Sequence, residues 1–181
     1  MDFLDRPIAV TDTELTGLDP DVHEIIEIGL VLLDPVTLDP IWRYDTKVIP
    51  EHIETASPEA LKINGYSEEE WRDAIPLRDA LEAYSTIAAD GVFLAHNMAT
   101  DWAFMRAGFK KTGVPDRLDY HRIDLFSTAF ALLHESELTE FKLLMLARHL
   151  GVPEEPLPHR AMGGAECAYQ IYRRLMQMSR D

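Results

Sequence analysis

The sequence predicts one α/β domain over residues 1–181, built on a mixed sheet of five strands with helices packed against it. Three strand-like segments joined by short connections come first, and single strands then alternate with helices. That order of elements is typical of an α/β layer architecture with a mixed sheet. A chain of 181 residues is also long enough to bury one substantial hydrophobic core.

The first three predicted strands should form an antiparallel meander. Residues 8–10 make a short apolar strand that runs directly into acidic residues. Residues 24–33 mix alternating and wholly apolar stretches, which indicates a second, largely buried strand. Residues 41–49 alternate apolar and polar side chains, as is typical of a strand near a sheet edge. Because short turns join strands of opposite direction, the three should pair in order.

The rest of the chain is predicted to be helical apart from two strands. A wholly apolar run at residues 91–95 indicates a central, buried strand, and residues 120–125 predict a weaker fifth strand. Apolar spacing and capping residues predict helices at 57–64, 76–89, 102–112, 126–133, 139–150 and from 159 or 160 to about 178. Three prolines make residues 152–158 an irregular loop. We assign Trp42 and Trp71 to the core.

The composition limits the compartment and the partners. The net charge of −15 argues against broad, non-specific binding of duplexes, which requires a basic surface. It allows nucleic acid in a small site where metal ions supply positive charge. The single cysteine, Cys167, excludes an internal disulfide and suits a reducing compartment. The sequence has neither a signal peptide nor an apolar run of membrane-spanning length, so we expect a cytoplasmic protein that does not enter membranes.

Acidic residues follow two of the apolar strands. On a strand, Asp12 and Glu14 share one face about 7 Å apart, and Asp101 comes shortly after the strand at 91–95. Carboxylates gathered beside a buried strand are unfavourable unless a cation lies between them, and a divalent ion is the usual solution. Taken singly, each has a plainer explanation. Asp12 and Glu14 could simply be solvated acidic residues at the end of a strand. Asp101 could be an acidic residue that the helix dipole favours near a helix start.

Three segments together resemble the motifs of the DEDDh 3′-to-5′ exonucleases, the superfamily of DNA polymerase III proofreading subunits and oligoribonuclease. In chain order they are Asp12-Thr13-Glu14-Leu15-Thr16-Gly17-Leu18, His96-Asn97-Met98-Ala99-Thr100-Asp101 and Pro158-His159-Arg160-Ala161-Met162-Gly163-Gly164-Ala165. Three motifs in the family's order and on the expected elements are a far more specific signal than any one alone. The resemblance implies a ribonuclease H-like fold.

The resemblance also implies catalytic roles. Hydrolysis of a phosphodiester needs an activated water, a stabilised phosphate and a neutralised leaving oxygen, which two Mg²⁺ or Mn²⁺ ions about 3.5–4 Å apart can supply. Asp12 is implied to bridge both ions, Glu14 to hold the ion on the water side, and Asp101 to act on the other ion. His159, with an ordinary pKa of ~6.5, would be the general base. Without the resemblance, His159 reads as an exposed loop histidine.

The turn after the first motif is implied to bind substrate, namely the 3′ ends of single-stranded nucleic acid or short oligonucleotides. The backbone of Thr16, Gly17 and Leu18, with the Leu18 side chain, would hold the terminal nucleotide. Phe104 could stack on a base, although an aromatic residue at this helical position is more often part of the core. We expect His96 to satisfy backbone groups rather than to contact substrate.

The chain departs from the family at Gly164, where the resemblance expects the fourth carboxylate. Glu166 is two positions further on, about 200° around the helix, and should face away. Sequence alone does not place the remaining candidates, which are Asp116, Asp119, Glu154 and Glu155. We therefore expect the fourth ligand to be absent. Its loss should weaken the water-side ion and leave an activity that is low, absent or dependent on Mn²⁺.

Three functional hypotheses follow. The first is an exonuclease that releases nucleoside monophosphates from the 3′ end of single-stranded DNA or RNA. The second, motivated by Gly164, is a degenerate relative that binds nucleic acid or a protein partner without cutting. The third is an acidic interaction domain whose motif matches arise by chance. Since the apolar pattern of the last helix ends at Met178, near the end of the sequence, we expect a free-standing exonuclease rather than a proofreading subunit.

Overall fold

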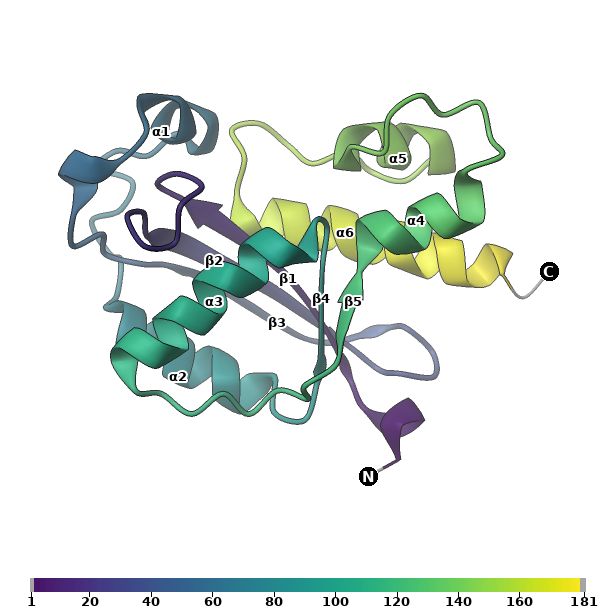
Figure 1. Cartoon of the computed structure of the whole chain (residues 1–181), viewed down its shortest axis with the longest axis horizontal. Helices are drawn as coiled ribbons and strands as arrows, with labels where there is room; N and C mark the ends of the chain where they lie inside the picture. The colour runs from purple at the N-terminus through teal and green to yellow at the C-terminus, as the bar shows by residue number, and fades with distance from the viewer. Residues whose placement is uncertain (1, 180–181) are drawn as a thin grey trace.

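A five-stranded sheet lies at the centre of the computed structural model, which describes residues 2–179 (Figure 1). The strand order is β3-β2-β1-β4-β5; the first three strands pair antiparallel, and β4 and β5 run parallel to β1. The strands are β1 (Ile8–Leu15), β2 (Ile25–Leu33), β3 (Pro40–Lys47), β4 (Val92–Ala95) and β5 (Arg122–Asp124). The predicted meander and mixed sheet are confirmed.

Helices cover both faces of this sheet (Figure 1). The helices of the described chain are η1 (Phe3–Asp5), η2 (Ile53–Thr55), α1 (Pro58–Asn64), α2 (Leu77–Ile87), α3 (Met98–Thr112), α4 (Leu125–Leu133), α5 (Leu143–Leu150) and α6 (Ala161–Met178). One hydrophobic core joins the sheet to α2 and α3, and another joins it to α4, α5 and α6. Among the described helices, none combines the length and apolar character needed to cross a lipid bilayer.

Side chains of β1 alternate between the two cores. Ile8 and Val10 belong to the core shared with α4, α5 and α6, and Ala9 belongs to the core shared with α2 and α3. The Thr11 hydroxyl lies 2.6 Å from the hydroxyl of Tyr84 on α2. Since alternate residues of a strand share a face, the two acidic residues at the following even positions face the α6 layer.

The first strand is longer than the sequence predicts. Asp12 pairs with Gly29 of β2, and Glu14 pairs with Glu27. The prediction that Asp12 lies just past a strand ending at Val10 is wrong, because β2 continues to pair with β1 beyond the apolar run. The backbone of both acidic residues is thus held by strand pairing rather than by a turn.

Gly29 allows α6 to pack directly on the sheet. A Cβ atom at this position would lie 2.3 Å from the carbonyl carbon and oxygen of Ala161, the first residue of α6. Such a distance is far inside van der Waals contact, so only glycine permits the approach. Because Gly29 is paired with Asp12, this contact places the first turn of α6 beside the Asp12 side chain.

The helix α3 begins earlier than predicted. The prediction places its start at Trp102, but the structure has it at Met98, whose amide donates a 3.0 Å hydrogen bond to Asp124 Oδ1. Asn97 precedes it in the left-handed backbone region, with φ of 57°. Asp101 therefore lies within the first turn of α3, which fixes the direction of its side chain.

Two other predictions are wrong, although α1 and its Ser57 cap are as predicted. The helix predicted from Thr139 begins at Leu143, since the preceding segment is held by its Phe141 carbonyl, which lies 2.9 Å from His96 Nε2. That contact also gives His96 the backbone partner expected of it. Trp42 is 58% exposed on the edge strand β3, whereas Trp71 is buried as predicted.

Candidate active site

Three carboxylates predicted to act together lie at one end of β1. Asp101 Oδ1 accepts hydrogen bonds from the Thr13 amide at 3.0 Å and from the Thr13 hydroxyl at 2.6 Å. Thr13 stands between Asp12 and Glu14 on β1. Its amide is available because β4 pairs with β1 only at residues 8–10. The structure thus brings Asp101 from α3 to the two carboxylates of the first strand.

These carboxylates strongly influence one another. Burial raises the pKa of Asp12 well above its usual range, and Asp101 raises it further, followed by Glu14 and Glu155. Burial is also the main cause that raises the pKa of Glu14 to about 8, and Glu155 is the next. Burial raises the pKa of Asp101 as well. At neutral pH this end of the sheet therefore retains protons that solvated carboxyl groups would release.

A further buried acid, Glu27, lies beside Glu14 on β2. Its side chain is almost fully buried, and within the described part of the chain its Oε2 atom has no hydrogen-bond partner. Burial, and then Asp45, raise the pKa of Glu27 to about 7. Arg160 opposes these effects, since its guanidinium lowers the pKa of both Glu14 and Glu27. Arg160 itself stacks over the ring of Trp71, 5.2 Å from the ring centre.

The loop at residues 152–158 brings Glu155 to the same place. Glu155 Oε1 lies 2.7 Å from His159 Nδ1, and the Glu155 side chain is only 13% exposed. A Cβ atom on Gly163 would lie 3.5 Å from Glu155 Cγ, so this acid rests on the first turn of α6. The His159 side chain is 40% exposed. His159 therefore stands at the rim of the acidic cluster, within reach of solvent.

Gly164 occupies the position that faces Asp12. A Cβ atom there would lie 2.4 Å from Asp12 Oδ2 and 2.6 Å from Asp12 Cγ. Any side chain at position 164 would thus share the space of the Asp12 carboxylate.

The other carboxylates considered from the sequence have partners elsewhere. Glu166 faces away as predicted, with its Oε1 atom 2.5 Å from Arg43 Nε on β3. The loop acids Asp116, Asp119 and Glu154 pair respectively with Arg122, Arg6 and Arg148. Of the four loop acids that the sequence left open, Glu155 is the one that joins the cluster.

The predicted substrate turn divides into a buried and an exposed part. Thr16 is fully buried, and its hydroxyl accepts a 2.8 Å hydrogen bond from the Glu24 amide, so it holds the turn from inside. The His23 ring packs against Gly17 so closely that a Cβ there would lie 2.4 Å from it. Leu18 is 82% exposed. A pocket of about 500 Å³ lies between this turn and α1.

The donors in this cluster fit divalent cations. The four charged groups that act most strongly on Asp12 are all carboxylates. Carboxylate oxygens are the donors that Mg²⁺ and Mn²⁺ prefer. The unpartnered oxygen of Glu27 is a second sign of missing positive charge. The donor chemistry of this acidic cluster therefore suits such ions.

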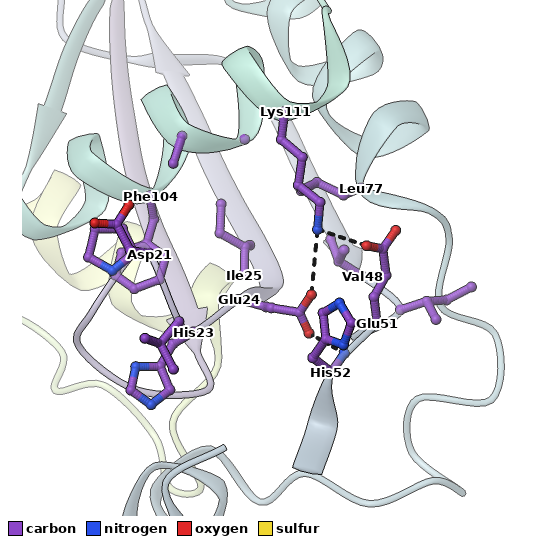
Figure 2. A pocket seen from close by; sticks show the side chains of 15 residues that line it. Asp21, His23, Glu24, Ile25, Val48, Glu51, His52, Leu77, Phe104 and Lys111 are labelled. Carbon is purple, nitrogen blue, oxygen red and sulfur yellow. Dashed lines mark hydrogen bonds and ion pairs between the residues drawn. The ribbon is translucent and has the colours of Figure 1, made fainter. Parts of the chain in front are cut away.

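A separate acidic group lines another pocket, of about 330 Å³ (Figure 2). Glu24, Glu51 and His52 offer atoms within 4.8 Å of one another. Lys111 Nζ lies 2.7 Å from Glu51 Oε2 and 3.7 Å from Glu24 Oε1, and Figure 2 shows it between the two carboxylates. This ammonium group already supplies the positive charge, so we interpret the group as an ion-pair network. Phe104, which also lines this pocket, is buried.

Comparison with known proteins removes one of the three functional hypotheses. The sequence model of the RNase_T family, described as an exonuclease, matches residues 9–172. The chain belongs to the RNase_T exonuclease family. Because the match spans all three motifs, the hypothesis of an acidic interaction domain with chance matches is wrong.

Relatives of this RNase_T exonuclease chain include much longer proteins. It is 31% identical over 179 residues to the DNA polymerase III PolC-type of Thermotoga maritima, covering 97% of this chain and 12% of that protein. It is 28% identical over 173 residues to the DNA polymerase III PolC-type of Oceanobacillus iheyensis, covering 93% of this chain and 11% of that protein. The chain thus spans about an eighth of the length of these relatives.

Solved exonuclease structures share the fold of this RNase_T exonuclease. The nuclease domain of 3′hExo, a DEDDh family member bound to rAMP, has a TM-score of 0.74 at 21% identity, covering 98% of this chain and 95% of that one. Product-bound exonuclease I has a TM-score of 0.81 at 15% identity, covering 97% of this chain and 45% of that one. The predicted exonuclease-like α/β fold is confirmed.

Sequence reasoning missed two residues of this acidic cluster, Glu27 and Arg160, and left a third, Glu155, without a place. A signal for Glu27 exists, since an acid in the middle of an apolar strand must find a polar neighbour. A signal for Arg160 exists as well, because it directly follows the predicted general base and a positive charge is favourable beside an acidic site. Glu155 lies in a loop whose conformation has no periodic pattern, so no comparable signal exists for it.

Proposed function

We propose that the chain is a 3′-to-5′ exonuclease that hydrolyses phosphodiester bonds at the 3′ end of single-stranded DNA or RNA. The observation that carries this proposal is the gathering of Asp12, Glu14 and Asp101 at one end of β1, with His159 at the rim. Membership of an exonuclease family supports the class of reaction.

We assign three carboxylates to cation binding. Asp12, Glu14 and Asp101 would hold two Mg²⁺ or Mn²⁺ ions, and such ions, when bound, supply the charge that activates water and stabilises the phosphate and the leaving oxygen. The raised pKa values of Asp12 and Glu14 support this assignment, because a cation would displace the retained protons. Both hydrogen bonds from Thr13 go to one oxygen of Asp101, which leaves the other oxygen available.

We assign His159 the role of general base. Its Nδ1 atom faces Glu155 Oε1, so a proton on Nδ1 is favoured and Nε2 is left to accept a proton from water. The partial exposure of the His159 side chain supports contact with a water molecule. An imidazole paired with a carboxylate in this way keeps one orientation and one tautomer.

The pocket between the Thr16–Leu18 turn and α1 is our candidate for the terminal nucleotide. Its volume of about 500 Å³ is in the range of small-molecule sites. Gly17 and Leu18 line it, whereas the Thr16 side chain supports the turn from below. Exonuclease I has been solved with a dA16 oligonucleotide, and the 3′hExo domain with rAMP, which supports a short single-stranded substrate here.

Gly164 should reduce this activity. A carboxylate at position 164 would lie against Asp12, and glycine removes that donor from the site. We therefore expect hydrolysis that is slow, absent or detectable only with Mn²⁺. The tandem Gly163-Gly164 also weakens the first turn of α6 by about 1 kcal/mol per residue relative to alanine, which loosens the segment that carries His159.

The test uses 3′-labelled and 5′-labelled oligonucleotides, DNA and RNA separately, with Mn²⁺ or Mg²⁺. We expect the 3′ label to be released as a mononucleotide while the 5′-labelled strand shortens stepwise. The control is Asp12→Ala, purified in parallel, which should leave the substrates intact. If the unmodified chain does not exceed this control on any substrate, the proposal of catalysis fails.

A second candidate is a degenerate relative that binds nucleic acid or a protein partner without cutting, and Gly164 is the observation that favours it. The variant Gly164→Asp separates the two. A large gain in hydrolysis would mean that only this carboxylate is lacking, whereas continued inactivity with retained oligonucleotide binding would favour the second candidate.

The biological partner follows from neither candidate. The PolC-type relatives suggest service to a polymerase. We propose that residues 1–181 act as one exonuclease domain. The cytoplasmic location expected from the lone Cys167 stays a prediction.

A further inference from the structure

We propose that Glu155 takes the place of the carboxylate missing at position 164 and binds the same cation as Asp12 and Glu14. This inference rests on the proposed function and extends it, because it assigns the fourth cation ligand to the loop before α6 rather than to α6 itself. The inference is motivated by the contacts that two acidic side chains make with two consecutive glycines of α6. Glu155 rests on Gly163, and Asp12 rests on Gly164.

The two glycines let the loop lie against the helix. A Cβ at position 163 would lie 3.3 Å from Pro156 Cδ and 3.5 Å from Glu155 Cγ. The contact with Pro156 is tight and the contact with Glu155 is ordinary van der Waals contact, so atoms beyond Cβ at position 163 would need room that the loop now occupies. The glycine pair therefore removes a carboxylate at 164 and at the same time admits one from the loop.

Two adjacent acidic side chains of the loop, Glu154 and Glu155, point in opposite directions. Glu154 turns outward and pairs with Arg148 Nε at 2.8 Å, and its side chain is 45% exposed. Glu155 turns inward, is 13% exposed, and its described partner is His159. Turning a carboxylate away from solvent into a cluster of other carboxylates is unfavourable without a cation. A bound cation would explain why the Glu155 side chain points inward.

Glu155 is also near both first-strand acids. It raises the pKa of Glu14 more than Glu27 does, although Glu27 is paired directly with Glu14 across β1 and β2. It acts on Asp12 as well, with more effect than Glu27. The geometry agrees with this influence, because Glu155 packs on Gly163, the neighbour of Gly164, and lies 2.7 Å from His159 Nδ1.

The alternative for Glu155 is a positioning role, in which it only orients His159 through the 2.7 Å contact with Nδ1. The two roles have different consequences. A cation ligand changes the affinity for Mn²⁺ itself. A residue that acts only through His159 leaves that affinity unchanged and alters the pH dependence of hydrolysis.

The decisive measurement is Mn²⁺ binding to the full chain, by isothermal titration calorimetry and by the loss of the free-ion electron paramagnetic resonance signal. We expect Glu155→Gln to weaken Mn²⁺ binding by about 10–100-fold. The matched control is Glu154→Gln, one residue away in the same loop, which should bind Mn²⁺ as the unmodified chain does. Circular dichroism in EDTA checks that both variants are folded.

A double-mutant cycle with Gly164→Asp gives a second, independent test. If Glu155 already acts as the fourth ligand, the new Asp side chain should restore most of the affinity lost in Glu155→Gln and add little to the unmodified chain. Equal gains in both backgrounds would overturn the inference. The movement of Asp12 that the new side chain requires is common to both backgrounds and cancels.

The outcomes separate this inference from the proposed function. Unchanged Mn²⁺ affinity in Glu155→Gln, with loss of affinity in Asp12→Asn, overturns the role of Glu155 and leaves the exonuclease site standing. In that case a shifted pH profile would assign Glu155 to positioning His159. Absence of Mn²⁺ binding in the unmodified chain would overturn both.

Discussion

Replacing Glu14 by glutamine should stabilise the metal-free protein, and the gain should grow as the pH rises. The Glu14 side chain is buried beside Glu27, Glu155 and Asp12, and its pKa is raised from an ordinary 4.5 to about 8. A group whose pKa is higher in the folded than in the unfolded state holds its proton more tightly in the folded state. Its contribution to stability is therefore complete below pH 4.5 and is lost as the pH rises toward 8.

The magnitude follows from the two pKa values. Since a tenfold difference in proton affinity corresponds to ~1.4 kcal/mol, the penalty relative to low pH is about 1 kcal/mol at pH 5.5 and about 3 kcal/mol at pH 7. It approaches about 5 kcal/mol above pH 8. Glutamine has no proton to lose, so Glu14→Gln should avoid this penalty. In a chain of this length, 3 kcal/mol corresponds to a rise in Tm of about 6–12 °C.

The assay is urea or thermal unfolding in EDTA, followed by circular dichroism from pH 5.5 to pH 8.5. The matched control is Glu69→Gln, a substitution at an exposed glutamate outside the site, which should follow the unmodified chain at every pH. Added Mn²⁺ should narrow the difference in stability, because an ion at 100 times its Kd stabilises the folded state by about 2.7 kcal/mol. Glu14→Gln should lose much of that gain.

Two results would refute the reasoning. If the unmodified chain and Glu14→Gln lose stability in parallel between pH 5.5 and pH 8.5, the carboxyl group is solvated rather than buried. If Glu14→Gln is the less stable protein at pH 8 in EDTA, the side chain makes a favourable interaction that the acidic cluster does not provide.

Three further substitutions test the architecture around the site. Asp101→Asn keeps the oxygen that accepts both hydrogen bonds from β1, so it should remain folded by circular dichroism while Mn²⁺-dependent hydrolysis falls by about 100-fold or more. Gly29→Ala places a Cβ 2.3 Å from the backbone of α6, and the overpacking should lower the free energy of unfolding by about 1–3 kcal/mol in a urea titration. Thr16→Val preserves shape but leaves the Glu24 amide without its acceptor, so the same titration should show a loss of about 1–3 kcal/mol. An unchanged urea midpoint in either of the last two would contradict the packing described here.

Most of the fold could be predicted because its determinants are local. Wholly apolar or alternating segments indicate strands, and capping residues such as Ser57 and Gly65 mark the ends of α1. The errors lie where tertiary contacts override these patterns. Trp42 is large and apolar but lies on the outer face of an edge strand. The segment before Leu143 has helical composition, but its Phe141 carbonyl is held by His96 instead.

The site could be predicted only in part, and strand register is one reason. The loop between β1 and β2 is too long to define which residues face each other, so the pairing of Glu14 with Glu27 could not be read from the sequence. The direction of Glu155 depends on the absence of side chains at Gly163 and Gly164, which lie in a different element. No periodic pattern in the sequence indicates such a dependence between two separate elements.

The acidic cluster links the low stability of the metal-free site to its proposed chemistry. A phosphodiester carries negative charge, and so does the chain, with a net charge of −15. Asp12, Glu14 and Asp101, once deprotonated, would repel a nucleic-acid strand, and Arg160 opposes only part of their charge, since the pKa of Glu14 stays raised in its presence. A divalent ion removes the repulsion among the carboxylates and the repulsion of the phosphate in one binding event. In the proposed function the ion would therefore bind before the nucleic acid or together with it, and a carboxylate from the loop would strengthen that step.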